Sequence, residues 1–171
     1  MEERPRSYSQ WMWAFAFLLV LALTGAGFQY WSLDGVSGLF LTVLLRDDTE
    51  YAPAYTDRAF RRVEVGMSEQ TVHDLLGSPL VETWEYTNVR DPGCFMVSFE
   101  GNLVAGAYSR ECGDLGIRDG MRRVEAVARL KPPDKITWHF SRSPRGSHYR
   151  ERAMTFVNNR VVERFSQWYV D

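Results

Sequence analysis

Hydrophobic and polar positions divide the chain into a long apolar segment near the N-terminus and a remainder of short patterned segments separated by turns. Residues 7–33 carry no charged side chain, tryptophans stand near the start of the apolar run, and Tyr30 and Trp31 stand at its end. About twenty helical residues cross the roughly 30 Å apolar core of a bilayer, with aromatic side chains at both interfaces. The pattern predicts a transmembrane helix over residues 11–31, preceded by a cytoplasmic tail over residues 1–10.

The distribution of basic residues predicts the orientation of this segment. Arg4 and Arg6 precede it, and the next basic residue is Arg46. Because basic residues are retained on the cytoplasmic side, we expect a single-pass protein of the bacterial inner membrane whose C-terminal domain is exported to the periplasm. A cleaved signal peptide is the alternative, since the small residues at 24–26 are suited to cleavage, and the sequence leaves this alternative open.

A polar linker that contains a second apolar run follows over residues 32–52. The run itself, at residues 39–45, is too short to span a membrane. It is compatible with a helix lying on the membrane face and equally with an element of the core, and the pattern does not choose between them.

The rest of the chain contains an internal repeat with a period of 54 residues. This shift superposes four pairs of identical residues: Gly66 on Gly120, Met67 on Met121, Pro79 on Pro133 and Trp84 on Trp138. Three further inserted residues bring residues 99–104 onto residues 156–161. Self-similarity at a fixed spacing indicates a duplicated structural unit. We place one unit at residues 53–113 and the other at residues 114–171.

Each repeat is predicted to fold as a helix, a strand and a hairpin. In the first repeat Ser68 is placed to cap the helix, and Gly77 followed by Pro79 is placed to end it. Alternating apolar residues then predict three strands, the last two joined by a turn at Gly101-Asn102. The second repeat lacks the capping serine, so its helix is expected to be shorter. The predicted fold class is α+β: an N-terminal transmembrane helix, then two tandem units whose strands form one antiparallel sheet with helices on one face.

Composition and charge exclude several classes of protein. The 171 residues hold 20 Lys and Arg and 22 Asp and Glu, a formal net charge of −2, which does not favour nucleic-acid binding. Two cysteines are too few for a disulfide-dense scaffold or a four-cysteine zinc site. Charge is nevertheless segregated: residues 28–116 hold 6 basic and 14 acidic residues, and residues 117–171 hold 12 basic and 6 acidic residues. Two interpretations fit this segregation of charge. One is a pair of solvated surfaces, one acidic and one basic, and the other is a bipolar surface that steers a partner.

Candidate chemistry is limited. Cys94 and Cys112 flank the predicted hairpin closely enough to meet, and export would allow a disulfide between them, with two buried free thiols as the alternative. The three histidines match no metal-ligand spacing, and no nucleophile with an orienting base is recognisable. We therefore expect no catalytic residue, no metal site and no bound cofactor.

A basic loop is the candidate site for binding a partner. It joins two predicted strands of the second repeat and carries Arg142, Arg145, Tyr149 and Arg150. Arginine pairs well with carboxylates and phosphates, so the loop is suited to the acidic face of a partner, to lipid headgroups or to a cell-wall anion. A merely solvated loop is the alternative. The repeated tryptophans are candidates for interface anchors, but their equal place in both repeats favours the core.

Residues 65–72 read VGMSEQTV, and residues 75–79 read LLGSP. These two stretches resemble the signature of the SmpA/BamE family of small outer-membrane-assembly lipoproteins. Downstream, the family pattern is matched by five residues, namely Trp84, Tyr86, Phe99, Asn102 and Val104. The resemblance covers residues 57–109 and, more faintly, residues 117–169. Two such units in one chain are similar to the β-lactamase inhibitor proteins. The resemblance implies the fold of the unit, a location in the cell envelope and a scaffolding or binding role.

Together these features predict a membrane-anchored binding or scaffolding module. We expect it to dock onto another envelope protein and to contact the lipid membrane through its N-terminal helix, with no nucleic-acid partner. An inhibitor or regulator of a periplasmic enzyme is one alternative, and an accessory subunit of a membrane complex is another. The sequence does not identify the partner.

Overall fold

The computed structural model describes residues 7–31, 33–87, 95–109 and 115–170. The chain divides into two compact units, residues 1–44 and residues 45–171. The first unit contains helix α1 (Ser7–Trp31) and helix α2 (Gly35–Leu44). The second apolar run of the sequence therefore lies mostly within a helix.

The apolar N-terminal segment is helical, but the prediction of a transmembrane helix over residues 11–31 is wrong. Among the residues that the structure describes, no helix is both long and apolar enough to cross a membrane. Single-pass anchoring in the inner membrane, and the periplasmic placement derived from it, are corrected on this finding.

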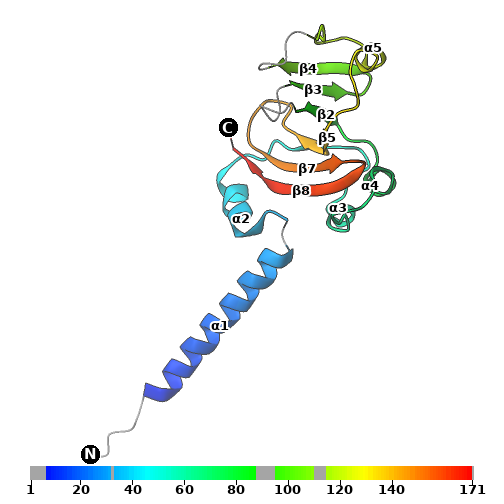
Figure 1. Cartoon of the computed structure of the whole chain (residues 1–171). Helices are drawn as coiled ribbons and strands as arrows, with labels where there is room; N and C mark the ends of the chain where they lie inside the picture. The colour runs from blue at the N-terminus through cyan, green and yellow to red at the C-terminus, as the bar shows by residue number, and fades with distance from the viewer. Residues whose placement is uncertain (1–6, 32, 88–94, 110–114, 171) are drawn as a thin grey trace, which may run out of the picture. The chain divides into compact units, whose positions relative to one another are not determined.

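Residues 45–171 form an α+β unit, and the residues described within it build two antiparallel sheets (Figure 1). The strands of the larger sheet are β2 (Val81–Tyr86), β3 (Phe95–Glu100), β4 (Leu103–Ser109), β5 (Lys135–His139), β7 (Tyr149–Val157) and β8 (Arg160–Tyr169). They lie in the order β4-β3-β2-β5-β7-β8. The smaller sheet pairs β1 (Glu50–Tyr51) with β6 (Ser141–Arg142). The helices are α3 (Asp57–Arg61), α4 (Glu69–Leu76) and α5 (Arg123–Val127).

The internal repeat has a direct counterpart in the larger sheet. Strands β2, β3 and β4 come from the first repeat and β5, β7 and β8 from the second, and the sheet joins them through β2 and β5 at its centre. Thr83 pairs with Thr137 in this central ladder. Both hairpins also shift register at the equivalent place, between residues 98 and 99 and between residues 155 and 156. The strands of the two repeats are therefore related by an approximate twofold axis through the Thr83–Thr137 pair.

Local signals in the sequence determine where α4 and α5, the equivalent helices of the two repeats, begin and end. Ser68 caps α4, because its Oγ accepts a hydrogen bond from the Thr71 backbone N–H at 3.2 Å. Gly77 ends α4 with a φ of 72°, in the left-handed region that glycine adopts without strain. In α5 the equivalent of Ser68 is Arg122, which makes no capping bond through its side chain, and α5 has five residues against eight in α4. The expectation of a shorter second helix is confirmed.

Each helix packs on the hairpin of the other repeat. At the start of α4, the Gly66 N–H donates to the carbonyl of Val161 at 2.8 Å, and the Glu69 N–H donates to the carbonyl of Asn159 at 3.2 Å. Val161 and Asn159 belong to the β7–β8 hairpin of the second repeat. Figure 1 shows α4 beside this end of the sheet. The first repeat thus supplies a helix to the second.

The reciprocal contact is made by α5. The Gly120 N–H donates to the carbonyl of Val104 at 2.8 Å, and the Arg123 N–H donates to the carbonyl of Asn102 at 2.7 Å. The repeat relates these two hydrogen bonds to the Gly66–Val161 and Glu69–Asn159 bonds at the start of α4. Because each repeat holds the helix of the other, residues 45–171 are one folded unit rather than two independent ones.

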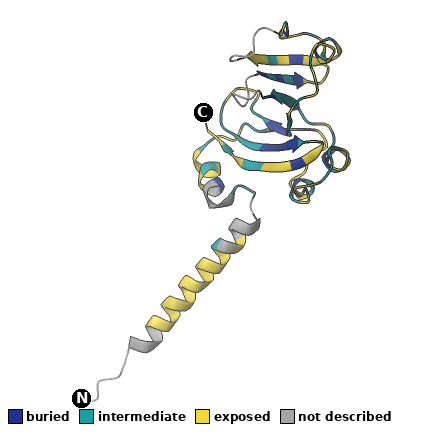
Figure 2. Cartoon of the chain, viewed as in Figure 1, coloured by how far each residue is buried: buried dark blue, intermediate teal, exposed yellow. Residues whose placement is uncertain are grey.

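The core lies between the helices and one face of the sheet. In β3 the residues Phe95, Val97 and Phe99 are buried in alternation, and Ala126 of α5 is buried in the same cluster. Figure 2 shows buried segments on the inner strands of the sheet, whereas the outer strands β4 and β8 are largely exposed. Because successive strand residues point to opposite faces, the residues between these positions line the other face of the sheet.

Candidate functional site

The sheet face opposite the core is hollowed into a cavity of about 400 Å³, which we call the open-face groove. It is lined from β2, β3, β5, β7 and β8. Its apolar lining comes from Met96, Ala153, Val162 and Phe165, and its polar and charged lining from Thr83, Glu85, Lys135, Thr137, His139, Glu151, Thr155, Glu163 and Gln167. The groove thus combines apolar side chains with hydrogen-bonding and charged groups, as protein-binding surfaces do.

Short side chains make the floor of the open-face groove. The Thr83 and Ser98 hydroxyls lie 3.0 Å apart, and the Thr137 and Thr155 hydroxyls lie 3.1 Å apart. Since Thr83 pairs directly with Thr137, the four hydroxyl residues form a row across β3, β2, β5 and β7. Thr83, Thr137 and Thr155 of this row line the groove, and Ser98 continues the row beyond the lining.

The charges at the rim make the open-face groove acidic. Lys135 Nζ lies 3.4 Å from Glu85 Oε2, and Gln167 Nε2 donates to Glu151 Oε2 at 2.7 Å. Burial holds the pKa of His139 below its ordinary value of 6.5, so this side chain is neutral at pH 7. With three glutamates, one lysine and a neutral histidine in its lining, the groove complements a positively charged surface.

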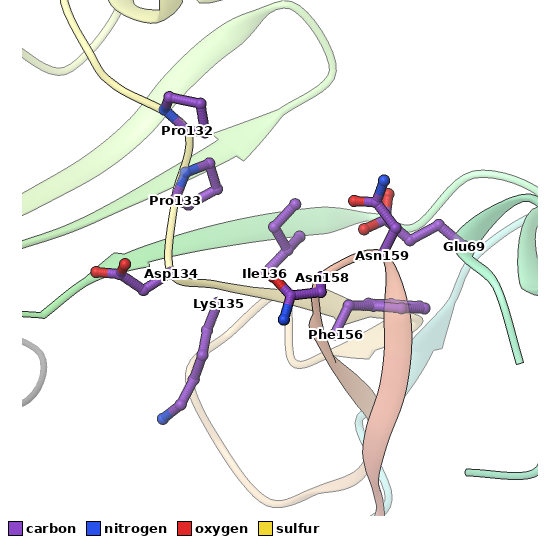
Figure 3. Close-up of a pocket in the computed structure, with 9 residues that line it drawn as sticks. All are labelled: Glu69, Pro132, Pro133, Asp134, Lys135, Ile136, Phe156, Asn158 and Asn159. Carbon is purple, nitrogen blue, oxygen red and sulfur yellow. The ribbon is translucent and has the colours of Figure 1, made fainter. Parts of the chain in front are cut away.

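Two further cavities lie on the helix-bearing side of the sheet and are equivalents under the repeat. The Glu69 pocket has a volume of about 400 Å³ and is lined by Glu69, Pro132, Pro133, Asp134, Lys135, Ile136, Phe156, Asn158 and Asn159 (Figure 3). The Arg123 pocket has a volume of about 350 Å³ and is lined by His73, Ser78, Pro79, Glu82, Phe99, Gly101, Asn102, Arg123 and Trp138. The repeat superposes Glu69 on Arg123, Pro133 on Pro79 and Phe156 on Phe99.

The Arg123 pocket is neutralised from within the chain. Arg123 Nη2 lies 2.7 Å from Glu82 Oε1. The guanidinium carbon of Arg123 lies 4.7 Å from the ring centre of Phe99 and 5.4 Å from that of Trp84, within cation–π range. Glu82 also accepts a hydrogen bond from Trp84 Nε1. The pocket therefore contains a cation, its counterion and the aromatic rings that the cation lies over, all supplied by this protein.

The Glu69 pocket holds a carboxylate in place of that cation. Glu69 Oε1 is buried and has no hydrogen-bond partner among the described residues. Burial raises the pKa of Glu69, and the charge of Glu82 raises it further. The other two charged residues of the lining, Asp134 and Lys135, point away from Glu69 in Figure 3. Asp134 Oδ2 accepts the Thr87 N–H at 2.6 Å.

The predicted basic loop is shorter than expected, since Arg142 lies in β6 and Tyr149 and Arg150 lie in β7, and its arginines are paired within the chain. Arg142 contacts two carboxylates, with its Nε 2.8 Å from Glu50 Oε2 and its Nη1 2.9 Å from Glu100 Oε2. Arg150 Nε lies 3.0 Å from Asp47 Oδ2. These pairs attach the loop to the segment that precedes α3, which gives the arginines a structural role.

The remaining residues of the basic loop also have partners. Arg145 Nε lies 3.9 Å from Asp48 Oδ1, and the ring centres of Tyr149 and Tyr169 are 5.3 Å apart. Three arginines thus meet carboxylates of both the preceding segment and β3, so the loop is not a free basic patch. Partner binding by the loop stays a prediction.

The acidic and basic parts of the sequence meet in the tertiary structure. Among the described ion pairs, all but Arg122–Glu125 join an acid from residues 28–116 to a base from residues 117–171. The segregated charge is therefore used at least in part to hold the two repeats and the preceding segment together. Neither interpretation made from the sequence included this role.

The other predicted residues are placed as follows. Trp138 is buried, with 8% of its surface exposed, and Trp84 is half-buried against the core, so both have core positions as the repeat suggested. Cys94 and Cys112 lie outside the described residues. Among the described residues, no group of three or more His, Cys, Asp or Glu side chains could hold a metal ion.

Sequence reasoning missed all three cavities. The open-face groove depends on which residues of β2, β5, β7 and β8 become neighbours, and strand order is not encoded in the period-2 pattern of one strand. The Glu69 and Arg123 pockets depend on the exchange of helices. One signal was available in the sequence: the 54-residue shift places Arg123 at the position of Glu69, which inverts the charge at the start of the helix.

Comparisons of this chain with protein-family models, with curated proteins and with solved structures found no match. The resemblance to the SmpA/BamE family accordingly remains a prediction from the sequence.

Proposed function

We propose that this protein is a protein-binding module that docks its partner in the open-face groove. One observation carries the proposal: the face of a six-stranded sheet opposite its core forms a groove of about 400 Å³ with mixed apolar and polar lining. A rigid sheet with a hollowed face offers a preformed surface, which lowers the entropic cost of binding. A scaffolding or regulatory role follows from such a module.

The lining specifies the chemistry of the partner. The acidic rim favours a segment that carries lysine or arginine, and the row of hydroxyls at the floor offers both donors and acceptors to backbone or side-chain groups. Met96 and Phe165, both half-buried, offer apolar contact beside these polar groups. We infer a partner that inserts a basic, partly apolar loop or extended segment.

Site-specific photo-crosslinking in cells that produce the protein tests this function. A photoreactive residue is placed at Gln167, on the rim of the groove, and in a separate variant at Gln70 on α4. The two glutamines are matched, because both are exposed and each donates one hydrogen bond to a neighbouring acid, at 2.7 Å to Glu151 and at 2.8 Å to Asp74. We expect one protein adduct from position 167 and none of that mass from position 70.

A second variant asks whether the groove itself is needed. Thr137→Arg fills the floor and adds a positive charge, so it should abolish the adduct at position 167 while the far-ultraviolet circular dichroism spectrum stays unchanged. Equal adducts from both positions, or an adduct that persists in folded Thr137→Arg, would contradict the proposal. If the captured partner is an enzyme, its activity with and without the purified protein decides between a scaffold and a regulator.

A further inference from the structure

We propose that the Glu69 pocket is a second binding site, specific for a guanidinium group that comes from outside this chain. It goes beyond the function proposed above, because the pocket lies on the helix-bearing side of the sheet and shares only Lys135 with the open-face groove. The Lys135 side chain points away from Glu69 (Figure 3). The two sites therefore succeed or fail independently.

The first argument is the unbalanced charge of Glu69. Its side chain lines a cavity together with two proline rings, Ile136 and Phe156, and one of its carboxylate oxygens is buried without a hydrogen-bond partner in the described part of the chain. A carboxylate removed from water without a partner costs free energy. An acid in the first turn of a helix is favourable, but that position does not require the side chain to enter a cavity. A cation in the pocket would offset the cost.

The second argument is the state of the equivalent pocket. There, the chain itself supplies a guanidinium, Arg123, which pairs with Glu82 and lies over Phe99. In the Glu69 pocket the repeat places Glu69 at the position of Arg123 and Ile136 at the position of Glu82. In the Arg123 pocket Glu82 is paired with Arg123, whereas among the described residues the buried oxygen of Glu69 has no hydrogen-bond partner. The same fold element thus already holds a guanidinium once in this molecule.

The basic residues around the Glu69 pocket are engaged elsewhere. Lys135 pairs with Glu85 at 3.4 Å on the opposite face of the sheet. Arg160, which follows Asn159 on the β7–β8 turn, donates from Nη1 to the Gly66 carbonyl at 2.8 Å. The carboxylate is therefore left available to an external group.

The lining favours guanidinium over ammonium. A guanidinium has five donors in a plane, and the pocket offers the Glu69 carboxylate together with the side chains of Asn158 and Asn159, whose amide oxygens can accept hydrogen bonds. Its flat, weakly hydrated faces pack well between apolar walls such as Pro132 and Pro133. An ammonium is more strongly hydrated and loses more on entering such a cavity. The ligand is an arginine side chain of a partner or a free guanidino compound.

Nuclear magnetic resonance titration of the intact protein tests the site. The probe is N-acetyl-L-arginine amide, and the matched neutral probe is the citrulline analogue, which has the same shape without the charge. We expect saturable shifts at the Asn158 and Asn159 side-chain amides and the Ile136 methyl groups with the arginine probe, and binding at least about tenfold weaker with citrulline. The lysine analogue should fall between them. Equal binding of arginine and citrulline probes, or shifts confined to other residues, would overturn the proposal.

Variants show whether Glu69 is the counterion. Glu69→Gln removes only the charge and should weaken binding of the arginine probe about tenfold. Glu64→Gln, at an exposed position outside the pocket, should leave it unchanged. If both variants weaken binding alike, or neither does, Glu69 is not the counterion and the proposal is wrong. Because the two-probe comparison uses the unaltered protein, it decides the matter even if Glu69→Gln changes the fold.

A third probe distinguishes the two sources of the guanidinium. Agmatine presents the group on a free chain, whereas the blocked arginine presents it as a residue within a polypeptide. Tighter binding of agmatine assigns the site to a free guanidino compound, and equal or weaker binding assigns it to a side chain of a protein partner. Either result upholds the guanidinium site, and no binding of either probe overturns it.

Discussion

Thr83 and Thr137 pair directly with each other across the centre of the sheet, and they are also each other's equivalents under the 54-residue repeat. A residue that pairs with its own equivalent lies on the symmetry axis of the pair. The hydroxyl contacts follow the same symmetry, since Thr83 contacts Ser98 at 3.0 Å and Thr137 contacts Thr155 at 3.1 Å. The duplicated sequence has therefore produced an approximately symmetric sheet with exchanged helices, and four predictions follow from its contacts.

Residues 45–113 produced alone should not fold. Helix α4 packs on the hairpin of the second repeat, and the Gly66–Val161 and Glu69–Asn159 hydrogen bonds cross between the repeats, so the isolated first repeat exposes both its helix face and its sheet edge. Far-ultraviolet circular dichroism and amide shift dispersion should report an unfolded chain. Mixing with residues 114–171 should restore native dispersion, whereas a cooperative thermal transition of the first repeat alone would show that the exchange is not needed for folding.

Arg123→Ala should lower the free energy of unfolding by about 1–3 kcal/mol, because it leaves the Glu82 carboxylate without its counterion and removes a cation–π contact. The side chains of Arg123 and Glu82 are only 31% and 15% exposed. Arg122→Ala is the matched control, because its partner is Glu125 and these side chains are 74% and 43% exposed. It should cost about 0.5 kcal/mol or less. Urea unfolding measures the free energy of unfolding of both variants. Equal losses would contradict a special role for the Arg123–Glu82 pair.

Asn159→Ala should destabilise the protein by about 1 kcal/mol more than Asn102→Ala, although the two asparagines occupy equivalent turn positions. Asn159 has a φ of 61°, in the left-handed region where asparagine is better tolerated than alanine, whereas Asn102 is not among the described non-glycine residues with positive φ. Their backbone carbonyls accept equivalent hydrogen bonds, which alanine would keep. Thermal unfolding of the two variants in parallel gives the difference, and a larger loss for Asn102→Ala would refute the backbone explanation.

Stability should fall as the pH drops below 6.5, and His139 should cause part of the fall. Burial holds the pKa of His139 below 6.5 in the folded protein, so the unfolded chain takes up a proton that the folded protein does not. The contribution is fully present above pH 6.5 and is lost as the pH falls from there. Glu151 lies near His139 and opposes the effect of burial.

The difference in unfolding free energy between the wild type and His139→Gln isolates this contribution, because other titrating groups are common to both. The difference should be constant above about pH 7 and should move in favour of the variant between about pH 7 and pH 5. A difference that stays constant over the whole range would show that His139 is protonated as easily in the folded protein as in the unfolded chain.

Local features of the fold could be predicted from the sequence because their causes are local. Ser68 and Gly77 bound α4 through a capping hydrogen bond and a left-handed backbone, and both effects act within one turn of the chain. The repeat similarly predicted two helix–strand–hairpin units in one antiparallel sheet, because equal patterns bury equal faces. The membrane-spanning prediction, made from the length of the uncharged run and the aromatic residues at its ends, is wrong, since no described helix is both long and apolar enough to cross a membrane.

The exchange of the helices could not be predicted, because α4 has the same apolar face whether it packs on its own hairpin or on the other one. For the same reason the Glu69 and Arg123 pockets, which form where an exchanged helix meets a hairpin, were not foreseen. The basic loop shows the same limit: its arginines were visible as charges, but their partners Asp47, Glu50 and Glu100 are brought to them only by the fold.

The sequence by itself determined helix α4, the hairpins and the existence of two equivalent units, since capping, turn conformation and apolar periodicity depend on neighbouring residues. Only the tertiary structure decided which strand edges meet, which helix covers which hairpin and which charges are neutralised. Those choices depend on burial and ion pairing between residues distant in the sequence. The candidate sites belong to this second group, because the open-face groove and the Glu69 pocket exist only where side chains from several strands, or from both repeats, converge.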